Sequence, residues 1–345
     1  MTETKYDIAK TSLISFPKTW LITGVAGFIG SNILEALLKL NQSVVGIDNF
    51  LTGKASNLEE VKELVSEEQW KNFVFLEGDI SNIDFCECVF SNFDFDYVLH
   101  HAAIVSSVRS VDDPILTNQI NINDFLNILV LARDSKVKRF IYASSCAVYG
   151  NYSKATKIED IIGDFVSPYA ITKYTNELYA KLFSELYGIE TVGLRYFNVF
   201  GKRQSFGGIY STVIPNWLID MINGKDIYIN GDEYLSRDFC YVEDCVQACI
   251  LAAFTKEASE RYVYNIGSGV ETTLCNLFYT MKRIIEHTLE NTIVPDVMYR
   301  ELRSGDVKYF RANINLAKEF LGYVPEWSLF DGLEKSLDWY LDKEK

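Results

Sequence analysis

The stretch TGVAGFIG at residues 23–30 places three glycines, Gly24, Gly27 and Gly30, between an apolar run and a helical pattern. The apolar run WLI just before it predicts a buried strand, and residues 29–40 carry apolar side chains at helical spacing. A strand, a GxxGxxG turn and a helix form a variant of the fingerprint that cradles a dinucleotide. Gly24 would permit the tight turn, Gly27 would let backbone N–H groups reach a pyrophosphate, and Gly30 would let the helix pack on the sheet.

Strand and helix patterns continue to alternate along the chain after this turn. We expect further strands at residues 44–48, 73–76, 97–100, 140–143 and 191–195. Strands that are apolar throughout and separated by helices are typical of a parallel sheet buried on both faces. The chain is therefore expected to form a doubly wound α/β sheet of the Rossmann type, with a smaller α/β lobe for the substrate.

The length of 345 residues suggests about two domains. We expect a nucleotide-binding domain at residues 1–195 and 236–268, and the smaller lobe at residues 196–235 and 269–345. Further elements are predicted as helices at residues 212–223, 242–254, 273–289 and 314–321, and as strands at residues 227–229 and 263–266.

Two long helices are predicted within the first domain. The first covers residues 114–135, with Asp113 as its N-cap. The second covers residues 168–187, between Ser167 as N-cap and Gly188 as the residue that ends it. Both carry substantial apolar surface, so each is expected to pack against a neighbour.

Acidic residues outnumber basic ones by 47 to 33, which gives a net charge of −14. Because nucleic acids and anionic membranes are bound through clustered positive charge, neither is an expected partner. The first residues lack the apolar core of a signal peptide, and no run of about 18 apolar residues follows. Seven cysteines, an odd number, suggest reduced thiols in the cytoplasm. Three histidines and no CxxC pair predict no metal site.

An acidic residue, Asp48, ends the strand after the glycine turn, 18 positions beyond Gly30. A carboxylate there accepts hydrogen bonds from the adenosine ribose hydroxyls and repels a 2′-phosphate. No lysine or arginine follows until Lys54, so NAD is expected rather than NADP. Asp79, after the third strand, is placed to meet the adenine, and its alternative role is to cap its own loop.

Tyr169 and Lys173 form a YxxxK pair at the start of a predicted helix. The spacing of four places both side chains on one face, where the ammonium would lower the pKa of the phenol and make it a base. Ser145 follows a predicted strand, at the sheet edge where such folds bind ligands. With NAD as oxidant, the three residues could remove an alcohol proton. The alternative is an ordinary amphipathic helix.

With these motifs, the chain resembles the extended short-chain dehydrogenase/reductases, and within them the nucleotide-sugar 4-epimerases. It is most similar to bacterial UDP-N-acetylglucosamine 4-epimerases of surface-polysaccharide pathways, and the likeness covers residues 17–340. The motifs that carry it are WLITGVAGFIGSN (20–32), VGIDNF (45–50), SPYAITKYTNE (167–177), LRYFNVFG (194–201), YING (228–231), RDFCYV (237–242) and RSGDV (303–307).

The resemblance implies C4 epimerisation of a UDP-sugar through a transient 4-keto sugar, with NAD kept tightly bound. Tyr169 would deprotonate the sugar 4-hydroxyl, Lys173 would tune Tyr169 and hold the nicotinamide ribose, and Ser145 would hydrogen-bond the same oxygen. The resemblance also implies that NAD contacts Gly24, Gly27, Phe28, Ile29, Gly30, Asp48, Asn49, Phe50, Thr52, Gly53, Asp79, Ile80, Ala102, Ala103, Asn121, Ala143, Tyr169 and Lys173.

The same resemblance implies a set of residues for the UDP-sugar. They are Ser106, Ser107, Ser145, Asn198, Val213, Trp217, Tyr228, Asn230, Arg237, Arg303, Asp306 and Phe310. Within this set, Arg237 and Arg303 would clamp the diphosphate, because the guanidinium matches phosphate geometry. The two long helices would pair with those of a second copy and form a homodimer. A monomer whose own lobe covers these faces is the alternative.

The chain departs from its relatives near the sugar. Phe310 stands where relatives that accept N-acetylated sugars carry a small residue, and where those restricted to UDP-glucose and UDP-galactose carry a tyrosine. Its ring could narrow the pocket, lean away from it, or belong to the core. Cys146 and Ala147 replace hydroxyl residues after Ser145. Arg109 could meet the carboxylate of a uronic acid or face solvent.

Three classes of function follow from these residues. The first is a 4-epimerase of UDP-GlcNAc and UDP-GalNAc, with UDP-glucose/galactose or a UDP-uronic acid as alternative substrates. The second is a net oxidoreductase or dehydratase on a nucleotide sugar, although the run after Ser145 lacks the Asp–Glu pair of 4,6-dehydratases. The third is a non-catalytic NAD-binding protein, and the presence of Ser145, Tyr169 and Lys173 together argues against it.

Overall fold

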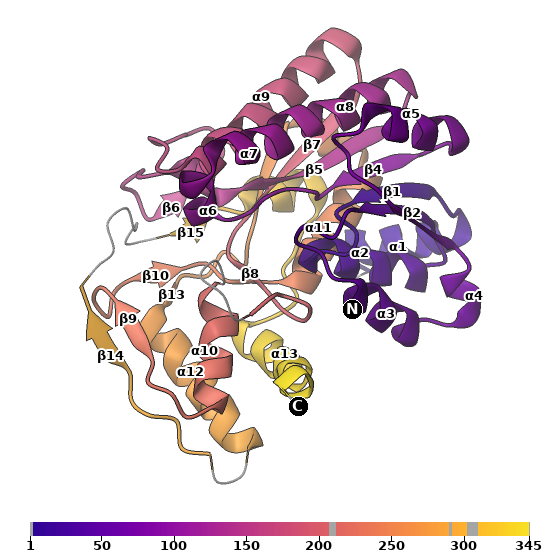
Figure 1. Ribbon diagram of the computed structural model, residues 1–345. Helices are drawn as coiled ribbons and strands as arrows, with labels where there is room; N and C mark the ends of the chain where they lie inside the picture. Colours follow the sequence, from indigo (N-terminus) through magenta and orange to yellow (C-terminus); the bar gives the residue numbers. More distant parts are fainter. Residues whose placement is uncertain (1–2, 207–211, 290–291, 302–309, 345) are drawn as a thin grey trace.

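A seven-stranded parallel sheet forms the centre of the computed structural model, which describes residues 3–206, 212–289, 292–301 and 310–344. The strand order is β12–β7–β5–β4–β1–β2–β3, as Figure 1 shows. The winding therefore reverses between β1 and β4, where a doubly wound sheet leaves a crevice for ligands. The strands are β1 (Thr19–Thr23), β2 (Ser43–Asp48), β3 (Phe73–Glu77), β4 (Tyr97–His100), β5 (Arg139–Ser145), β7 (Glu190–Tyr196) and β12 (Val263–Ile266).

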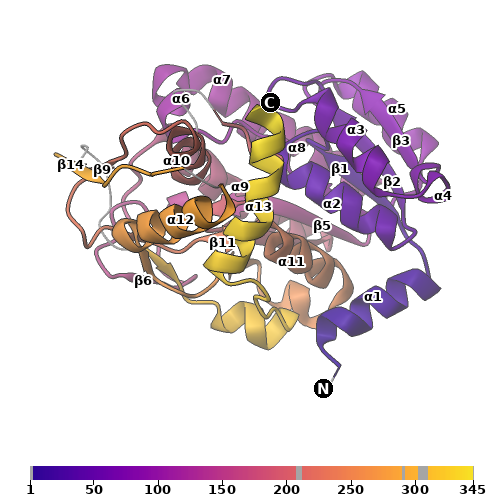
Figure 2. The ribbon, with the colours of Figure 1, turned by 90° about the horizontal axis from the view of Figure 1, so that it is seen from below.

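Helices cover both faces of this sheet, and each face has its own buried apolar cluster. α1 (Lys5–Ser15), α2 (Phe28–Lys39) and α11 (Val242–Phe254) pack on one face, as seen in Figure 2. α5 (Ile83–Asn92), α8 (Asp124–Asp134) and α9 (Pro168–Tyr187) pack on the other face. The structure thus confirms the expected α/β fold and all seven predicted strands of the central sheet.

A second apolar core lies beside the sheet layers. α10 (Val213–Ile222), α12 (Leu274–Thr288) and α13 (Leu329–Glu344) build it, with α13 in yellow in Figure 2. The chain enters this core after β7, returns to the sheet at α11, and leaves it again after β12. Short strand pairs accompany it: β8 (Val199–Phe200) with β11 (Cys240–Tyr241), β9 (Tyr228–Asn230) with β14 (Met298–Arg300), β10 (Ser236–Arg237) with β13 (Thr272–Thr273), and β6 (Thr156–Lys157) with β15 (Arg311–Ala312).

The predicted helix over residues 114–135 is wrong as a single helix. The structure has α7 (Pro114–Asn118), a π-helical turn η1 (Gln119–Asn123) and then α8. The wide turn carries the buried Asn121, whose amide bonds the backbone of Ile104 and thereby interrupts the regular spacing. The expected helix at residues 314–321 is likewise mostly a π-helical turn, η4 (Ala317–Leu321).

The predicted caps are confirmed. Asp113 accepts a hydrogen bond from the backbone N–H of Leu116, and Ser167 accepts one from Ala170. Gly188 ends α9 with a left-handed φ of +73°, which glycine adopts without strain.

Several elements were not expected from the sequence. They are α1, α5, α13, α3 (Ala55–Leu64), α4 (Glu67–Trp70), α6 (Ser107–Asp112), η2 (Cys146–Tyr149), η3 (Lys256–Glu260) and most of the short strand pairs. Within the described ranges, no helix combines the length and the apolar character that crossing a membrane requires.

Candidate active site

The turn between β1 and α2 has no room for a side chain at Gly24 or Gly30. Gly24 has a φ of +72°, and a Cβ atom there would lie 2.8 Å from the backbone nitrogen of Ala102. A Cβ atom at Gly30 would lie 2.1 Å from the carbonyl oxygen of Gly24. α2 begins at Phe28 with Gly27 as its N-cap, and no side chain caps it. The N–H groups of this helix end are therefore open to an anionic group such as a pyrophosphate.

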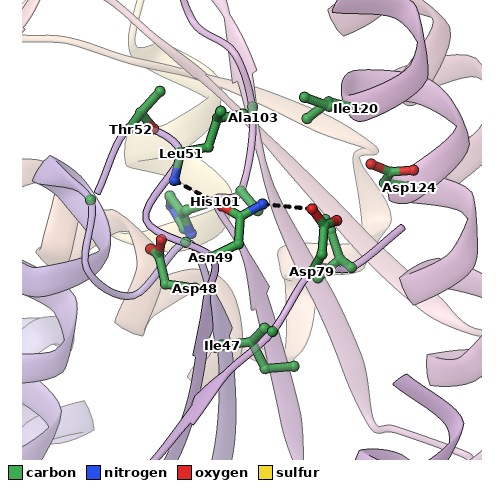
Figure 3. Close-up of a pocket in the computed structure, with 15 residues that line it drawn as sticks. Ile47, Asp48, Asn49, Leu51, Thr52, Asp79, His101, Ala103, Ile120 and Asp124 are labelled. Carbon is green, nitrogen blue, oxygen red and sulfur yellow. Dashed lines mark hydrogen bonds between the residues drawn. The ribbon is translucent and has the colours of Figure 1, made fainter. Parts of the chain in front are cut away.

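A pocket lies next to this turn, at the carboxyl ends of β1, β2, β3 and β4 (Figure 3). Its lining includes nine of the residues expected to bind NAD: Gly24, Gly27, Asp48, Asn49, Thr52, Asp79, Ile80, Ala102 and Ala103. Phe28, Ile29 and Gly30 instead form the first turn of α2. Phe50 and Gly53 belong to the loop after β2, and a Cβ atom at Gly53 would lie 2.9 Å from both carboxylate oxygens of Asp48.

Polar groups in this pocket already hold the loops around it. Asp48 accepts hydrogen bonds from the backbone N–H groups of Ala26 at 2.9 Å and Phe50 at 2.8 Å. Asn49 donates to Asp79 at 2.7 Å, a bond drawn in Figure 3. Asp79 also accepts from the backbone of Ser81 at 2.8 Å, so it caps its loop and lines the pocket at once. The glycine turn, the carboxylates of Asp48 and Asp79 and the uncapped N-terminus of α2 together fit a dinucleotide.

The sequence reasoning missed some residues of this pocket, among them Leu51, His101, Ile120 and Asp124. Asp124 lies at the helix side of the pocket in Figure 3, and its residue is only 1% exposed. Burial raises the pKa of its carboxyl to about 6, a hydrogen bond from Gln119 opposes the rise, and the charge of Asp79 adds to it. A signal was present, because Asp124 follows the expected Asn121 by nearly one helical turn.

Asn121 does not line the pocket, and its side chain instead links two neighbouring segments by hydrogen bonds. Its side-chain oxygen accepts from the backbone N–H of Ile104, and its amide donates to the Ile104 carbonyl, both at 2.9 Å. The same amide donates to the Thr172 hydroxyl at 3.1 Å. Asn121 therefore ties the loop after β4 to α9, the helix that carries Tyr169.

The expected catalytic residues come together at the carboxyl end of β5. Tyr169 is 7% exposed, and its phenol lies close enough to the hydroxyl of Ser145 for the two groups to interact. Lys173 lies one turn further along α9, with its Nζ 6.0 Å from the centre of the Tyr169 ring. This ammonium donates to the carbonyl of Ala143 at 2.9 Å, which anchors α9 to β5.

The expected lowering of the Tyr169 pKa is wrong for the protein without ligands. Burial raises the pKa of Tyr169 to about 12, and the interaction with the Ser145 hydroxyl opposes this rise only in part. Burial also lowers the pKa of Lys173 to about 8. The ammonium of Lys173 is directed to Ala143 rather than to the phenol, so it does not offset the desolvation of Tyr169.

The residues expected to bind the UDP-sugar are spread over the loop after β4 and the second core. Ser106 caps α6 by accepting from the backbone of Arg109 at 3.0 Å, and the exposed Ser107 begins that helix. Asn198 donates to the carbonyl of Asp238 at 2.9 Å. The guanidinium of Arg237 donates to the carbonyl of Ser236 at 2.8 Å.

The remaining nucleotide positions lie around α10 and β9. Val213 is the first residue of α10, whereas Trp217 is buried in the second core, with its ring centre 6.4 Å from that of Phe278 in an edge-to-face arrangement. Tyr228 and Asn230 lie on β9, and the guanidinium of Arg300 stacks 3.3 Å from the Tyr228 ring centre. Arg303 and Asp306 lie outside the described residues.

Phe310 belongs to the apolar core. Its residue is 8% exposed, and its ring lies 5.6 Å from that of Phe197 and 6.4 Å from that of Tyr149, measured between centres. Among the readings open from the sequence, packing of this ring into the core therefore matches the structure. The half-buried Cys146 directly follows Ser145, and burial raises its pKa to about 12.

Comparison with known proteins identifies the family. The sequence model of the NAD dependent epimerase/dehydratase family matches residues 20–267. The chain belongs to this family. Membership confirms the expected NAD cofactor and the expectation of an enzyme related to epimerases.

Individual relatives are UDP-sugar 4-epimerases by name. The chain is 35% identical over 322 residues to a putative UDP-glucose 4-epimerase of Methanocaldococcus jannaschii, covering 92% of this chain and 97% of that protein. It is 31% identical over 326 residues to a UDP-glucuronate 4-epimerase of Thermodesulfobacterium geofontis, covering 93% and 95%. The structure of a Methanobrevibacter ruminantium UDP-N-acetylglucosamine 4-epimerase with UDP-N-acetylmuramic acid matches with a TM-score of 0.85 and 33% identity, covering 95% and 99%. The chain is thus one of the NAD-dependent UDP-sugar 4-epimerase group, whose members differ in their sugar.

Proposed function

We propose that this chain is an isomerase that inverts C4 of a UDP-sugar, with UDP-GlcNAc and UDP-GalNAc as its substrate pair. The observation that carries the reaction is the position of Tyr169 on α9, which the hydrogen bond from Lys173 to Ala143 holds against the end of β5 that carries Ser145. The buried phenol of Tyr169 and the half-buried hydroxyl of Ser145, at the ligand-binding edge of the sheet, can hold one alcohol oxygen of a substrate between them.

Each residue has a defined part in this proposal. The glycine turn and Asp48 hold NAD, which when bound supplies the oxidant that takes the hydrogen from C4 and returns it. Tyr169 would accept the proton of the 4-hydroxyl as a phenolate and later give it back, which requires that bound ligands lower its pKa from the value of about 12 in the protein without them. Ser145 hydrogen-bonds the same oxygen, and Lys173 keeps α9 against β5 through Ala143. The net change would be an inversion because the 4-keto sugar turns in the site before the hydrogen returns, so that C4 receives it on the opposite face, and Tyr169 ends the cycle as it began.

The choice of an N-acetylated sugar is supported by Phe310. A bulky residue at this position would exclude an N-acetyl group if its ring projected into the sugar pocket. The ring instead packs against Phe197 and Tyr149. The relative that acts on UDP-N-acetylglucosamine by name supports the same choice.

A UDP-uronic acid is the second candidate substrate, and Arg109 is the observation that favours it. Arg109 lies on α6, whose N-cap Ser106 belongs to the loop expected to line the sugar. Within the described part of the chain, no carboxylate pairs with its guanidinium. A sugar carboxylate would satisfy this charge.

The test is NMR of the purified protein incubated separately with UDP-GlcNAc, UDP-glucose and UDP-glucuronic acid, without added cofactor. We expect UDP-GlcNAc to give its C4 epimer. Turnover of UDP-glucuronic acid alone would favour the role of Arg109. Bound NAD with no epimer from any of the three would overturn the proposal in favour of a net oxidoreductase or dehydratase, which requires added cofactor or releases a different sugar.

The proposal extends to assembly and setting. We infer a homodimer formed through α8 and α9, which lie side by side on one face of the sheet in Figure 1. Exposed apolar side chains on α9 support this: Ile171, Leu178, Leu182 and Leu186. A cytoplasmic location and a role in making precursors of surface polysaccharide complete the proposal, because UDP-sugars are donors for glycan synthesis.

A further inference from the structure

Lys157 is a buried cation close to the proposed sugar site. It is 0% exposed, and its ammonium donates to the carbonyls of Tyr152 at 2.5 Å and Lys154 at 2.8 Å. Within the described ranges, no carboxylate forms an ion pair with it. Burial of an ammonium costs free energy unless its N–H groups have acceptors. The carbonyls of Tyr152 and Lys154 supply two such acceptors.

The remaining neighbours of this ammonium are aromatic. Its Nζ lies 4.7 Å from the centre of the Phe310 ring and 5.3 Å from that of Tyr152. A cation over a ring face is attracted by the quadrupole of the ring, and the attraction is stronger where water is excluded. Lys157 therefore holds Phe310 from one side, while Phe197 and Tyr149 pack on the ring from others.

The backbone keeps the two residues in register. β6 and β15 pair in parallel, with Lys157 opposite Ala312. The N–H of Arg311 donates to Ala155 at 3.0 Å, and the N–H of Asn313 donates to Lys157 at 2.9 Å. Phe310 immediately precedes β15, so the pairing of β15 with β6 places its ring next to the ammonium of Lys157.

The location connects this pair with the reacting groups. The Phe310 ring that Lys157 contacts packs on Tyr149, which ends the short turn directly after Ser145, and on Phe197, which directly precedes Asn198. Lys157 thus contacts a ring that lies between the turn after the proposed catalytic Ser145 and the segment that leads to Asn198, a residue expected to bind the UDP-sugar.

Resting on the proposed function, we propose that Lys157 is a positioning residue that sets sugar specificity by holding the Phe310 ring in the core. With the ring held, the pocket has room for an N-acetyl group. Without the ammonium, the ring loses one of its attractive contacts and can turn toward the sugar, where it excludes the larger substrate more than the smaller one.

The test compares Lys157→Met with the wild type in epimerisation of UDP-GlcNAc and UDP-glucose, measured as kcat and KM for each. Lys157→Gln, which keeps a donor for the two carbonyls but no charge, is a second variant in case Lys157→Met does not fold. Lys154→Met is the matched control, because Lys154 is an exposed lysine of the same loop. We expect kcat/KM for UDP-GlcNAc to fall about tenfold through a higher KM, and that for UDP-glucose to change less than about threefold.

A double variant separates positioning from general damage. If Lys157 acts through the ring, Phe310→Ser in the Lys157→Met background restores UDP-GlcNAc turnover at least about threefold. An equal loss for both sugars, or no restoration by the second substitution, would overturn the inference while the proposed function stands. Wild-type protein that epimerises neither sugar would defeat the proposed substrate itself.

Discussion

The guanidinium of Arg195 and the carboxylate of Glu177 form a buried two-point ion pair, with Nε and Oε1 at 2.8 Å and Nη2 and Oε2 at 2.7 Å. Glu177 lies on α9, eight residues after Tyr169, and Arg195 lies on β7, next to β5. The hydroxyl of Ser144, beside Ser145, also donates to Glu177 at 2.5 Å. Glu177 therefore joins the helix of Tyr169 to β7 through Arg195 and to the strand of Ser145 through Ser144.

Glu177→Gln leaves the Arg195 guanidinium buried without a counter-charge. Breaking such a pair from one side costs about 3–5 kcal/mol, so we expect a loss of that size in the free energy of unfolding. Urea and thermal unfolding at pH 7 measure it. Glu185→Gln, on the same helix but exposed, is the control and should cost less than about 0.5 kcal/mol. Equal stability of the two variants would contradict this account.

Tyr169→Phe removes the proposed base without changing the shape of the site. General acid–base catalysis contributes about 10²–10⁴ in rate, so kcat should fall by at least about 100-fold. The NAD content of the purified protein should stay as in the wild type, because the glycine turn and Asp48 are untouched. NMR for the epimer and absorbance for the nucleotide measure the two quantities. Tyr187→Phe, at an exposed tyrosine of α9, is the control.

Asp124→Asn should change how stability depends on pH. In the folded protein the pKa of Asp124 is raised to about 6, against 3.8 for an ordinary aspartate. Between these values the folded state binds a proton that the unfolded state does not, so stability falls as pH rises through this window. The variant cannot ionise and escapes this loss, which is about 1–3 kcal/mol.

Thermal unfolding from pH 3.5 to 8 measures the effect of this substitution. The melting temperature of Asp124→Asn should match the wild type near pH 3.5 and exceed it above pH 6. Asp94→Asn, at an exposed aspartate, controls for the change in charge. A difference between Asp124→Asn and the wild type that is the same at all pH values would refute the assignment.

Leu182→Glu should dissociate the proposed dimer. Leu182 is 45% exposed in the middle of the apolar side chains along α9, and a buried carboxylate there would lack a partner. Light scattering after gel filtration gives the mass of the particle. Lys181→Glu, an exposed neighbour that reverses a charge outside this row, should leave the mass unchanged. A wild-type monomer would exclude the dimer directly.

Parts of the site were predictable because local geometry demands particular residues. The glycine turn is one case, since a side chain at Gly30 would collide with the backbone of Gly24. The caps Asp113 and Ser167 are another, because each binds an N–H group only three residues away. Contacts of this kind can be predicted because both partners lie within a few residues of each other in the sequence.

Other features depend on residues that are distant in the sequence. The π-helical turn at Asn121 depends on Ile104, which belongs to a loop 17 residues earlier. The raised pKa of Tyr169 depends on how the whole site excludes water. α13 is different, because Leu333, Leu337 and Tyr340 repeat at helical spacing and the signal for a helix was present.

The path of the chain between its two cores has a mechanical consequence. The chain leaves the sheet after β7, returns at α11 and leaves again after β12. The backbone therefore passes between the two apolar cores three times. A hinge opening of the two cores would require all of these connecting segments to bend at the same time. We therefore expect the two cores to melt in one transition, and a sugar nucleotide to enter and leave through excursions of single loops.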